Sequence, residues 1–369
     1  MLTKFKVANF KGFNTEIVFN LKETNNYNFN KHNIKNGIVN NALVYGPNSV
    51  GKSNLGLAIF DIIAHLTDKE NSDIQYSFYL NALNNSKTAD FQYEFKFDSY
   101  NVIYKYKKTD HKTIISEEFI INNKQLAFID RTISNDANIL FKGAETLKTT
   151  LIDKNLSLLK YIKNNSVLDN NEENKCFNKF YDFVDKMLFF RSLQENMYLG
   201  VEVGRRVLDE DIIENNNVND LEAFLNKVGI KCKLVVIKEA GQDIIAFDFK
   251  GKHIAYYNIA SSGTKSLILF YFWLQRLKKK KVSFLFIDEF DAFYHHELSK
   301  LIVKKLVNIG VQFVLTTHNT SIISNDLLRP DCYFLMNYDE IKPLSKCTTK
   351  ELREAHNLEK MYKAGIFNV

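Results

Sequence analysis

The chain has 369 residues, of which 45% are hydrophobic, 13% aromatic and 25% charged. This composition excludes a disordered chain and is typical of a folded protein with enough apolar material for a large core. The 49 basic and 43 acidic residues give a net charge of +6, a weak field for this length, which permits nucleic acid as a partner but does not demand it.

The cysteines and the apolar runs indicate the cellular setting. Cys176, Cys232, Cys332 and Cys347 form no CxxC pair and no zinc spacing, so we expect reduced, mostly buried thiols. The first ten residues alternate lysine with apolar residues and lack the apolar core of a signal peptide. The longest apolar run, residues 267–274, is shorter than the roughly 20 residues that cross a bilayer. A soluble cytoplasmic protein with no membrane partner is predicted.

The N-terminal elements are a strand, a second strand and a helix. Residues 5–10 predict a short strand, and residues 38–45 predict a buried strand that ends in a glycine turn. Residues 54–66 predict a helix with apolar side chains on one face. Those side chains are Leu55, Ala58, Ile59, Ile62 and Ile63.

The turn between that strand and that helix carries the sequence GPNSVGKS, which matches the P-loop pattern G-x-x-x-x-G-K-[ST]. The glycines allow a loop whose backbone N–H groups form an anion nest, next to the positive end of a helix dipole. Lys52 is expected to reach the β and γ phosphates of ATP, and Ser53 to bind Mg²⁺. An ordinary glycine turn is the alternative, and the strand and helix context argues against it. The predicted nucleotide-binding residues here are Gly46, Pro47, Asn48, Ser49, Val50, Gly51, Lys52, Ser53 and Asn54.

The middle of the chain holds no recognisable motif. Residues 81–118 alternate apolar and polar side chains and predict antiparallel strands. Residues 143–228 predict helices separated by polar joints. Residues 232–258 return to strands, with a hairpin turn at residues 238–243.

Two further elements precede the second motif. Residues 259–265, with the sequence IASSGTK, open an apolar helix. The basic run at residues 278–281 follows it, and we interpret this run as a solvated helix C-terminus, which favours cations. A patch that tracks phosphates is the alternative.

Residues 282–289, VSFLFIDE, form an apolar strand that ends in two acids. Asp288 is expected to hold Mg²⁺ through its water shell and Glu289 to polarise the attacking water, as in a Walker B motif. Alone, the pattern also fits an ordinary acidic loop, but together with the P-loop it indicates a nucleotide site. The strand predicted at residues 311–317 then leads to His318, and Asp291 follows Glu289 by two positions.

The order and spacing of these motifs resemble those of ABC-type ATPases. Asp288 lies 236 positions after Lys52, whereas AAA+ and small GTPase chains place the second motif one or two βα units after the P-loop. The IASSGTK segment resembles the LSGGQ signature, with Ser261 and Gly263 in the matching positions and departures at Ser262 and Thr264. A plain Ser-Gly helix cap is the alternative for this segment.

The same resemblance assigns roles to three other residues. His318 resembles the switch histidine of this class, although a lone histidine is more often structural, and Asp291 resembles the D-loop acid. Gln75 is a weak match to the Q-loop glutamine. The implied cofactors are ATP and Mg²⁺.

Both ends of the chain resemble a narrower group. The opening ANFKGF resembles the heads of RecF, SMC and OLD proteins, and the ending NLEKMYKAGIF is similar to bacterial AAA-group ATP-binding proteins related to OLD and to phage-defence ATPases. OLD proteins carry a Toprim nuclease domain after the ATPase. Only 51 residues follow His318, so a self-contained nuclease is not expected.

The predicted fold is an α/β P-loop ABC-type ATPase head with a β-rich lobe and a helical insertion. Residues 1–67 and 251–369 would form the two halves of the core, and residues 68–250 the lobe and insertion. The resemblance implies a head-to-tail dimer in which Ser261 and Gly263 of one subunit close on ATP held by the other, with higher oligomers left open.

Three functions are compatible with these motifs. The favoured one is an ATPase subunit that senses or scaffolds in phage defence and works with a separately encoded effector protein. The others are a DNA repair or maintenance ATPase of RecF or SMC type, and a binding module with vestigial hydrolysis.

Overall fold

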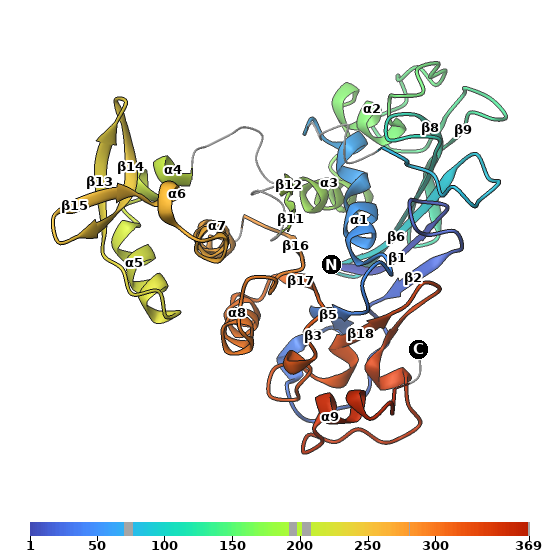
Figure 1. Ribbon diagram of the computed structural model, residues 1–369. Helices are drawn as coiled ribbons and strands as arrows, with labels where there is room; N and C mark the ends of the chain where they lie inside the picture. Colours follow the sequence, from blue (N-terminus) through green and yellow to red (C-terminus); the bar gives the residue numbers. More distant parts are fainter. Residues whose placement is uncertain (70–76, 192–197, 201–207, 280, 368–369) are drawn as a thin grey trace.

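The computed structural model describes residues 1–69, 77–191, 198–200, 208–279 and 281–367. Its core is a seven-stranded sheet in which five neighbouring strands run parallel and an antiparallel strand closes each edge (Figure 1). In spatial order the strands are β12 (Tyr198–Gly200), β11 (Met187–Arg191), β16 (Phe284–Asp288), β17 (Gln312–Thr317), β5 (Asn41–Tyr45), β18 (Tyr333–Met336) and β19 (Ile341–Pro343).

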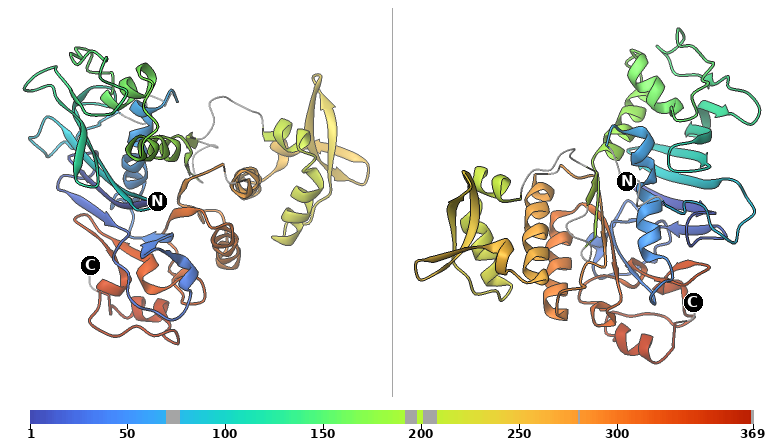
Figure 2. Two further views of the ribbon diagram at one scale, coloured as in Figure 1. Left: turned by 180° about the vertical axis from the view of Figure 1, so that it is seen from behind. Right: turned by 45° about the horizontal axis from the view of Figure 1, so that its top comes forward.

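Helices cover both faces of this sheet, which explains why its central strands are continuously apolar. Helix α1 (Lys52–Leu66) lies on one face, and α7 (Ser262–Lys278) and α8 (His296–Ile309) lie on the other (Figures 1 and 2). All five residues of β16 are buried. The P-loop strand β5 and the acid-bearing strand β16 are not neighbours, because β17 lies between them.

A second seven-stranded sheet is antiparallel and packs on the other side of α1. The Tyr93 hydroxyl donates to the carbonyl of Ala58 in α1 at 2.8 Å. The strands predicted within residues 81–118 are confirmed in this sheet. Its strands are β10 (Asn138–Ile139), β9 (Lys124–Asp130), β8 (Ile114–Ile121), β7 (Tyr100–Lys108), β6 (Ala89–Phe97), β1 (Leu2–Ala8) and β2 (Ile17–Asn20).

The helical prediction for residues 143–228 is only partly right. The helices are α2 (Leu158–Asn165), α3 (Glu172–Asp185), α4 (Leu208–Glu214) and α5 (Val218–Lys227). Residues 143–157 are not helical, and residues 187–191 form strand β11 of the core sheet. The run MLFF is apolar on both faces, and such a short run does not distinguish a buried strand from a buried helix by periodicity.

A three-stranded sheet projects from α7 on the side away from α1 (Figure 2). It consists of β13 (Leu234–Glu239), β14 (Gln242–Phe249) and β15 (Lys252–Ala255), and α6 (Tyr256–Ile259) joins it to α7. Ala240 and Gly241 both have positive φ, which is the backbone of a tight two-residue hairpin. The hairpin predicted at residues 238–243 is therefore confirmed.

The remaining elements complete the head. The short pair β3 (Ile34–Lys35) and β4 (Ile38–Val39) precedes β5, and α9 (Leu358–Lys363) lies near the C-terminus. The four cysteines are free thiols, three buried and Cys232 half-buried, as predicted. Within the described ranges, no helix combines the length and apolar character needed to cross a membrane.

Candidate nucleotide-binding site

The P-loop connects β5 to α1 through a backbone that only certain residues can adopt. Gly51 has a φ of 105° and Ser49 a φ of 67°, so the loop enters the left-handed region twice. A Cβ at Gly51 would lie 2.6 Å from the Phe13 ring, and one at Gly46 would lie 2.5 Å from the carbonyl oxygen of Met336. Both positions therefore require glycine, and the positive φ values favour a concave backbone that binds anions.

Lys52 begins α1 and turns back over the loop. Its Nζ donates to the carbonyls of Gly46 and Pro47, each at 2.7 Å, and lies 3.2 Å from Nδ1 of His318. Only 5% of the residue is exposed. Burial lowers the pKa of Lys52 to about 8, although the nearby carboxylates of Glu289 and Asp288 favour the charged form.

Asp288 and Glu289 follow the last apolar residue of β16. Asp288 is 1% exposed, and its Oδ1 accepts from the Thr316 hydroxyl at 2.7 Å. That hydroxyl accepts from the backbone N–H of Glu289 at 2.8 Å. Glu289 has a φ of 48°, a strained conformation for a residue with a side chain. Thr316 of β17 thus fixes both acids relative to the neighbouring strand.

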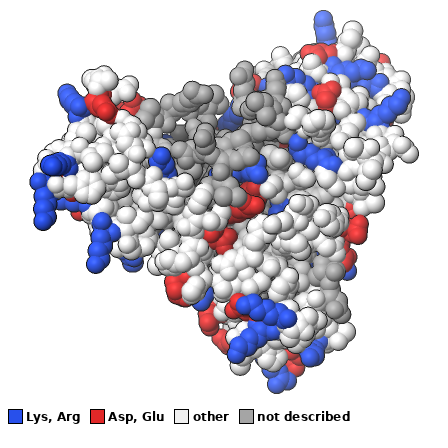
Figure 3. All heavy atoms as spheres, in the orientation of Figure 1, with Lys and Arg blue, Asp and Glu red and all other residues white. Residues whose placement is uncertain are grey.

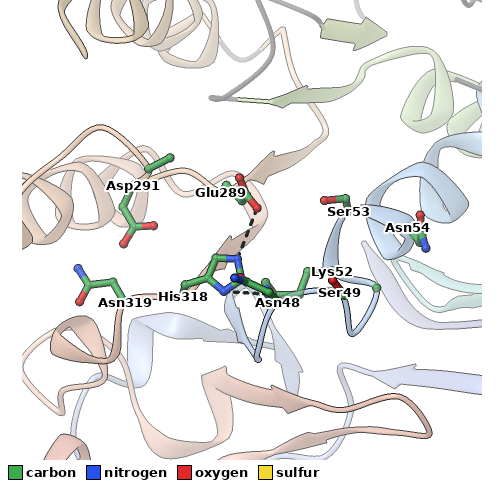
Figure 4. A pocket seen from close by; sticks show the side chains of 11 residues that line it. Asn48, Ser49, Lys52, Ser53, Asn54, Glu289, Asp291, His318 and Asn319 are labelled. Atoms are coloured by element: carbon green, nitrogen blue, oxygen red, sulfur yellow. Dashed lines mark hydrogen bonds and ion pairs between the residues drawn. The ribbon is translucent and has the colours of Figure 1, made fainter. Parts of the chain in front are cut away.

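His318 lies between Lys52 and Glu289 (Figure 4). Since the Lys52 ammonium only donates, Nδ1 of His318 must accept, and the ring proton is placed on Nε2. Nε2 lies 3.4 Å from Oε1 of Glu289. The neutral Nε2–H tautomer therefore links the lysine of the P-loop to the acid beyond β16.

Asp291 lies on the same side of the cavity. Its Oδ2 accepts from the Thr317 hydroxyl at 2.8 Å, and that hydroxyl accepts from the N–H of Asn319. Burial raises the pKa of Asp291, and the hydrogen bond from Thr317 opposes the rise.

These groups surround a cavity of about 720 Å³, large enough for a nucleotide (Figure 4). Its lining residues are Asn48, Ser49, Gly51, Lys52, Ser53, Asn54, Glu289, Asp291, Ala292, His318 and Asn319. The concave P-loop fits phosphates. The Ser53 hydroxyl lines the cavity and the Asp288 carboxylate directly precedes the cavity-lining Glu289, and both are oxygen ligands of the kind that Mg²⁺ takes when phosphates supply the others. Among the described residues, no cluster of three or more His, Cys, Asp and Glu forms an all-protein metal site.

The other predicted residues take different places. Gly46 and Pro47 face Lys52 through their carbonyls, and Val50 is buried. Ser261 caps α7, where its Oγ accepts from the N–H of Thr264 at 3.2 Å. Neither Ser261 nor Gly263 lines the cavity of its own chain. Gln75 lies outside the described residues.

Four contributors were missed at the sequence level. Thr316 and Thr317 are the last two residues of β17 and bind the acids, and Asn319 lies two positions beyond the strand and lines the cavity. A pair of threonines at the end of an apolar strand was the available signal. Arg191, the last residue of β11, donates from Nε to Oδ2 of Asp288 at 3.1 Å. No local signal marked Arg191, because its segment was predicted to be helical.

This fold and site define a P-loop ATPase with an ABC-type head. The family model described as "AAA domain, putative AbiEii toxin, Type IV TA system" matches residues 42–324, and the chain belongs to this family. The comparison with curated proteins gives no match.

Solved SMC heads are similar at low identity. The SMC head domain from Thermotoga maritima has 15% identity and a TM-score of 0.42, covering 93% of this chain and 98% of that one. An SmcHead bound to the C-winged helix domain of ScpA has 16% sequence identity and a TM-score of 0.45, and the match covers 94% of this chain and 98% of that one. A Pyrococcus furiosus Smc head with an extended coiled coil, bound to the C-terminal domain of ScpA, has 13% sequence identity and a TM-score of 0.47. The match covers 98% of both chains.

Proposed function

We propose that this protein is a Mg²⁺-dependent ATPase whose heads pair when ATP binds. The observation that carries the proposal is the convergence of Lys52, Glu289 and His318 on one cavity, with Asp288 buried beside it. The carboxyl ends of parallel strands meet at one edge of a sheet, which is where open α/β sheets bind ligands.

Each residue has a role that its position suits. The P-loop amides and Lys52 would bind the phosphates, and Ser53 and Asp288 would hold Mg²⁺, which supplies charge neutralisation at the β and γ phosphates. Glu289 would orient and polarise the attacking water. His318 would keep Glu289 oriented through its Nε2–H.

The position of the signature residues supports a composite site. Ser261 is exposed at the start of α7 and does not line its own cavity. Tyr257, Ile259 and Phe293 are exposed at 42%, 46% and 38%, and Phe293 lies beside Gly263. A second subunit placed head to tail would cover these apolar side chains. The N–H groups at the start of α7 of the first subunit would then face the γ-phosphate of the ATP held by the second subunit. Pairing would then depend on ATP.

We infer a role in phage defence as the ATPase subunit that senses or scaffolds in the cytoplasm, with a separately encoded effector. The family description names a toxin of a type IV toxin–antitoxin system, an arrangement of two components, and this supports a separate partner. We expect the partner to dock on the segment of residues 68–250, much of which lies away from the nucleotide cavity.

A basic cluster favours a second function, a DNA repair or maintenance ATPase of RecF or SMC type. The cluster consists of Lys227 at the end of α5, Lys278 at the end of α7 and Lys305 on α8. The pKa of Lys305 is lowered, first by burial and then by the positive charges of Lys227 and Lys278. Further Lys and Arg side chains gather at the outer edge of the three-stranded lobe (Figure 3). Duplex DNA binding that persists at physiological salt, without a stable protein partner, would favour this function.

The ATPase proposal is tested by separating binding from hydrolysis. Glu289→Gln keeps the size of the side chain and removes its charge, so we expect ATP to bind and remain unhydrolysed, with turnover reduced at least about a hundredfold. Lys52→Ala should weaken ATP binding itself. Filter binding of labelled ATP and phosphate release measure the two steps. Wild-type turnover by Glu289→Gln would show that another residue polarises the water.

A further inference from the structure

Arg191 meets the proposed metal acid at the edge of the core sheet. Strands β11 and β16 are parallel neighbours, and their last residues, Arg191 and Asp288, are paired in register. The Arg191 side chain is 22% exposed and the Asp288 side chain 1% exposed. The pairing brings together residues 97 positions apart in the chain.

Both carboxylate oxygens of Asp288 are engaged. Thr316 donates a neutral hydrogen bond to Oδ1, and Arg191 donates a charged one to Oδ2. A buried carboxylate without a positive partner is strongly unfavourable, because it loses its hydration. Arg191 therefore supplies the positive charge that a metal would otherwise supply.

We propose that Arg191 holds Asp288 when this carboxylate carries no Mg²⁺ and leaves Oδ2 when the metal binds. The inference rests on the proposed function, which places Mg²⁺ at Asp288. A metal held at Asp288 would compete with the guanidinium for the negative charge of the carboxylate, and a divalent ion would repel a guanidinium that remained beside it. Arg191 thereby lowers the Mg²⁺ affinity of the head and makes β11 responsive to the metal-loaded nucleotide.

Replacement of Arg191 by the metal at Asp288 could be transmitted to the antiparallel sheet. Strand β11 follows directly from α3, and α3 packs against both α1 and β6 of the antiparallel sheet. Release of Arg191 would therefore alter an element that joins the nucleotide site, through α3, to the antiparallel sheet. Arg191 acts through Asp288 and is a positioning residue.

The test measures Mn²⁺ binding to the protein saturated with a non-hydrolysable ATP analogue, from the EPR signal of free Mn²⁺, with binding to the analogue alone subtracted. Arg191→Gln removes a charged hydrogen bond that competes with the metal, so we expect about tenfold tighter Mn²⁺ binding. Arg191→Lys, which keeps the charge, should restore most of the wild-type affinity. Thermal melting checks that each variant is folded.

Two control variants make the result specific. Arg353→Gln removes an equal charge from an exposed ion pair with Glu351, at 2.8 Å and outside the cavity, and should leave Mn²⁺ affinity unchanged. Asp288→Asn should weaken Mn²⁺ binding. Unchanged or weaker binding in a folded Arg191→Gln variant, with Asp288→Asn weakened, overturns the role of Arg191 alone. An unchanged Asp288→Asn variant overturns the metal site itself.

Discussion

Lys52 combines a buried position with several polar partners. Its ammonium donates to two loop carbonyls and lies near two acids, yet burial still lowers its pKa to about 8. Burial thus makes the charged form of the lysine less favourable than it is in water, and an incoming phosphate would add negative charge that stabilises the ammonium. The free-energy cost of burying this charge therefore falls on the P-loop when no nucleotide is bound.

The lowered pKa of Lys52 predicts a pH-dependent stability. The folded pKa lies below the unfolded value of 10.5, so the stability that the group contributes is present above pH 10.5 and is lost as pH falls through about 8. Lys52→Met removes this loss. Its thermal midpoint relative to wild type should rise as pH falls from 10.5 to below 8 and then stay level, measured without nucleotide. A difference that is the same at every pH would contradict the prediction.

Helix α1 is joined to the antiparallel sheet by a buried polar network. Asp61 of α1 and Lys108 of β7 form an ion pair at 2.8 Å, and both side chains are 0% exposed. The carboxylate also accepts from the hydroxyls of Tyr79 and Tyr106, at 3.0 and 2.9 Å. The helix that begins with the P-loop is therefore fixed to the β-rich lobe by fully satisfied buried charges.

Breaking this pair should be costly. Lys108→Met leaves Asp61 buried without its counter-ion, and we expect a loss of about 3–5 kcal/mol in the free energy of unfolding by urea. The neighbouring Lys107 forms an exposed pair with Asp90 at 2.7 Å, so Lys107→Met is a matched control that should cost under about 1 kcal/mol. Equal losses in the two variants would mean that burial of the pair does not determine its strength.

At the scale of the whole molecule, the two halves of the proposed composite site lie on separate parts of the head. The cavity is bounded by the P-loop and by residues that follow β16 and β17, whereas Ser261 lies at the start of α7, on the other face of the sheet from α1 (Figure 1). One chain therefore offers a donor surface and an acceptor cavity that do not meet within it. When each subunit places its α7 surface on the cavity of the other, the two composite sites are related by a twofold axis and the pair is closed.

Mixing two inactive variants tests this arrangement. Lys52→Ala disables the cavity, and Ser261→Arg blocks the surface at α7. A heterodimer of the two retains one of its two composite sites, so each heterodimer should have up to about half of the activity of a wild-type pair, measured as phosphate release. Absence of recovery, with heterodimers demonstrated by differently tagged subunits, would contradict a role for Ser261 in the partner's site.

The sequence by itself determined the parts of the site that depend on local chain geometry. A glycine-rich turn between a strand and a helix identified the P-loop, and the apolar strand ending in Asp288 and Glu289 identified the second motif. Period-two alternation predicted the antiparallel sheet, because each strand has one face on the core. Each of these patterns spans only about ten consecutive residues, so it can be recognised without knowledge of the tertiary structure.

Only the tertiary structure decided which strand ends meet. Strand β17 separates β5 from β16, and this order places His318 between Lys52 and Glu289 and Thr316 against Asp288. Strand β11 was predicted to be helical, so the pair of Arg191 and Asp288 was not predicted. The order of strands in a sheet depends on packing across the whole core. The neighbours of a buried parallel strand therefore cannot be predicted from a short segment of sequence.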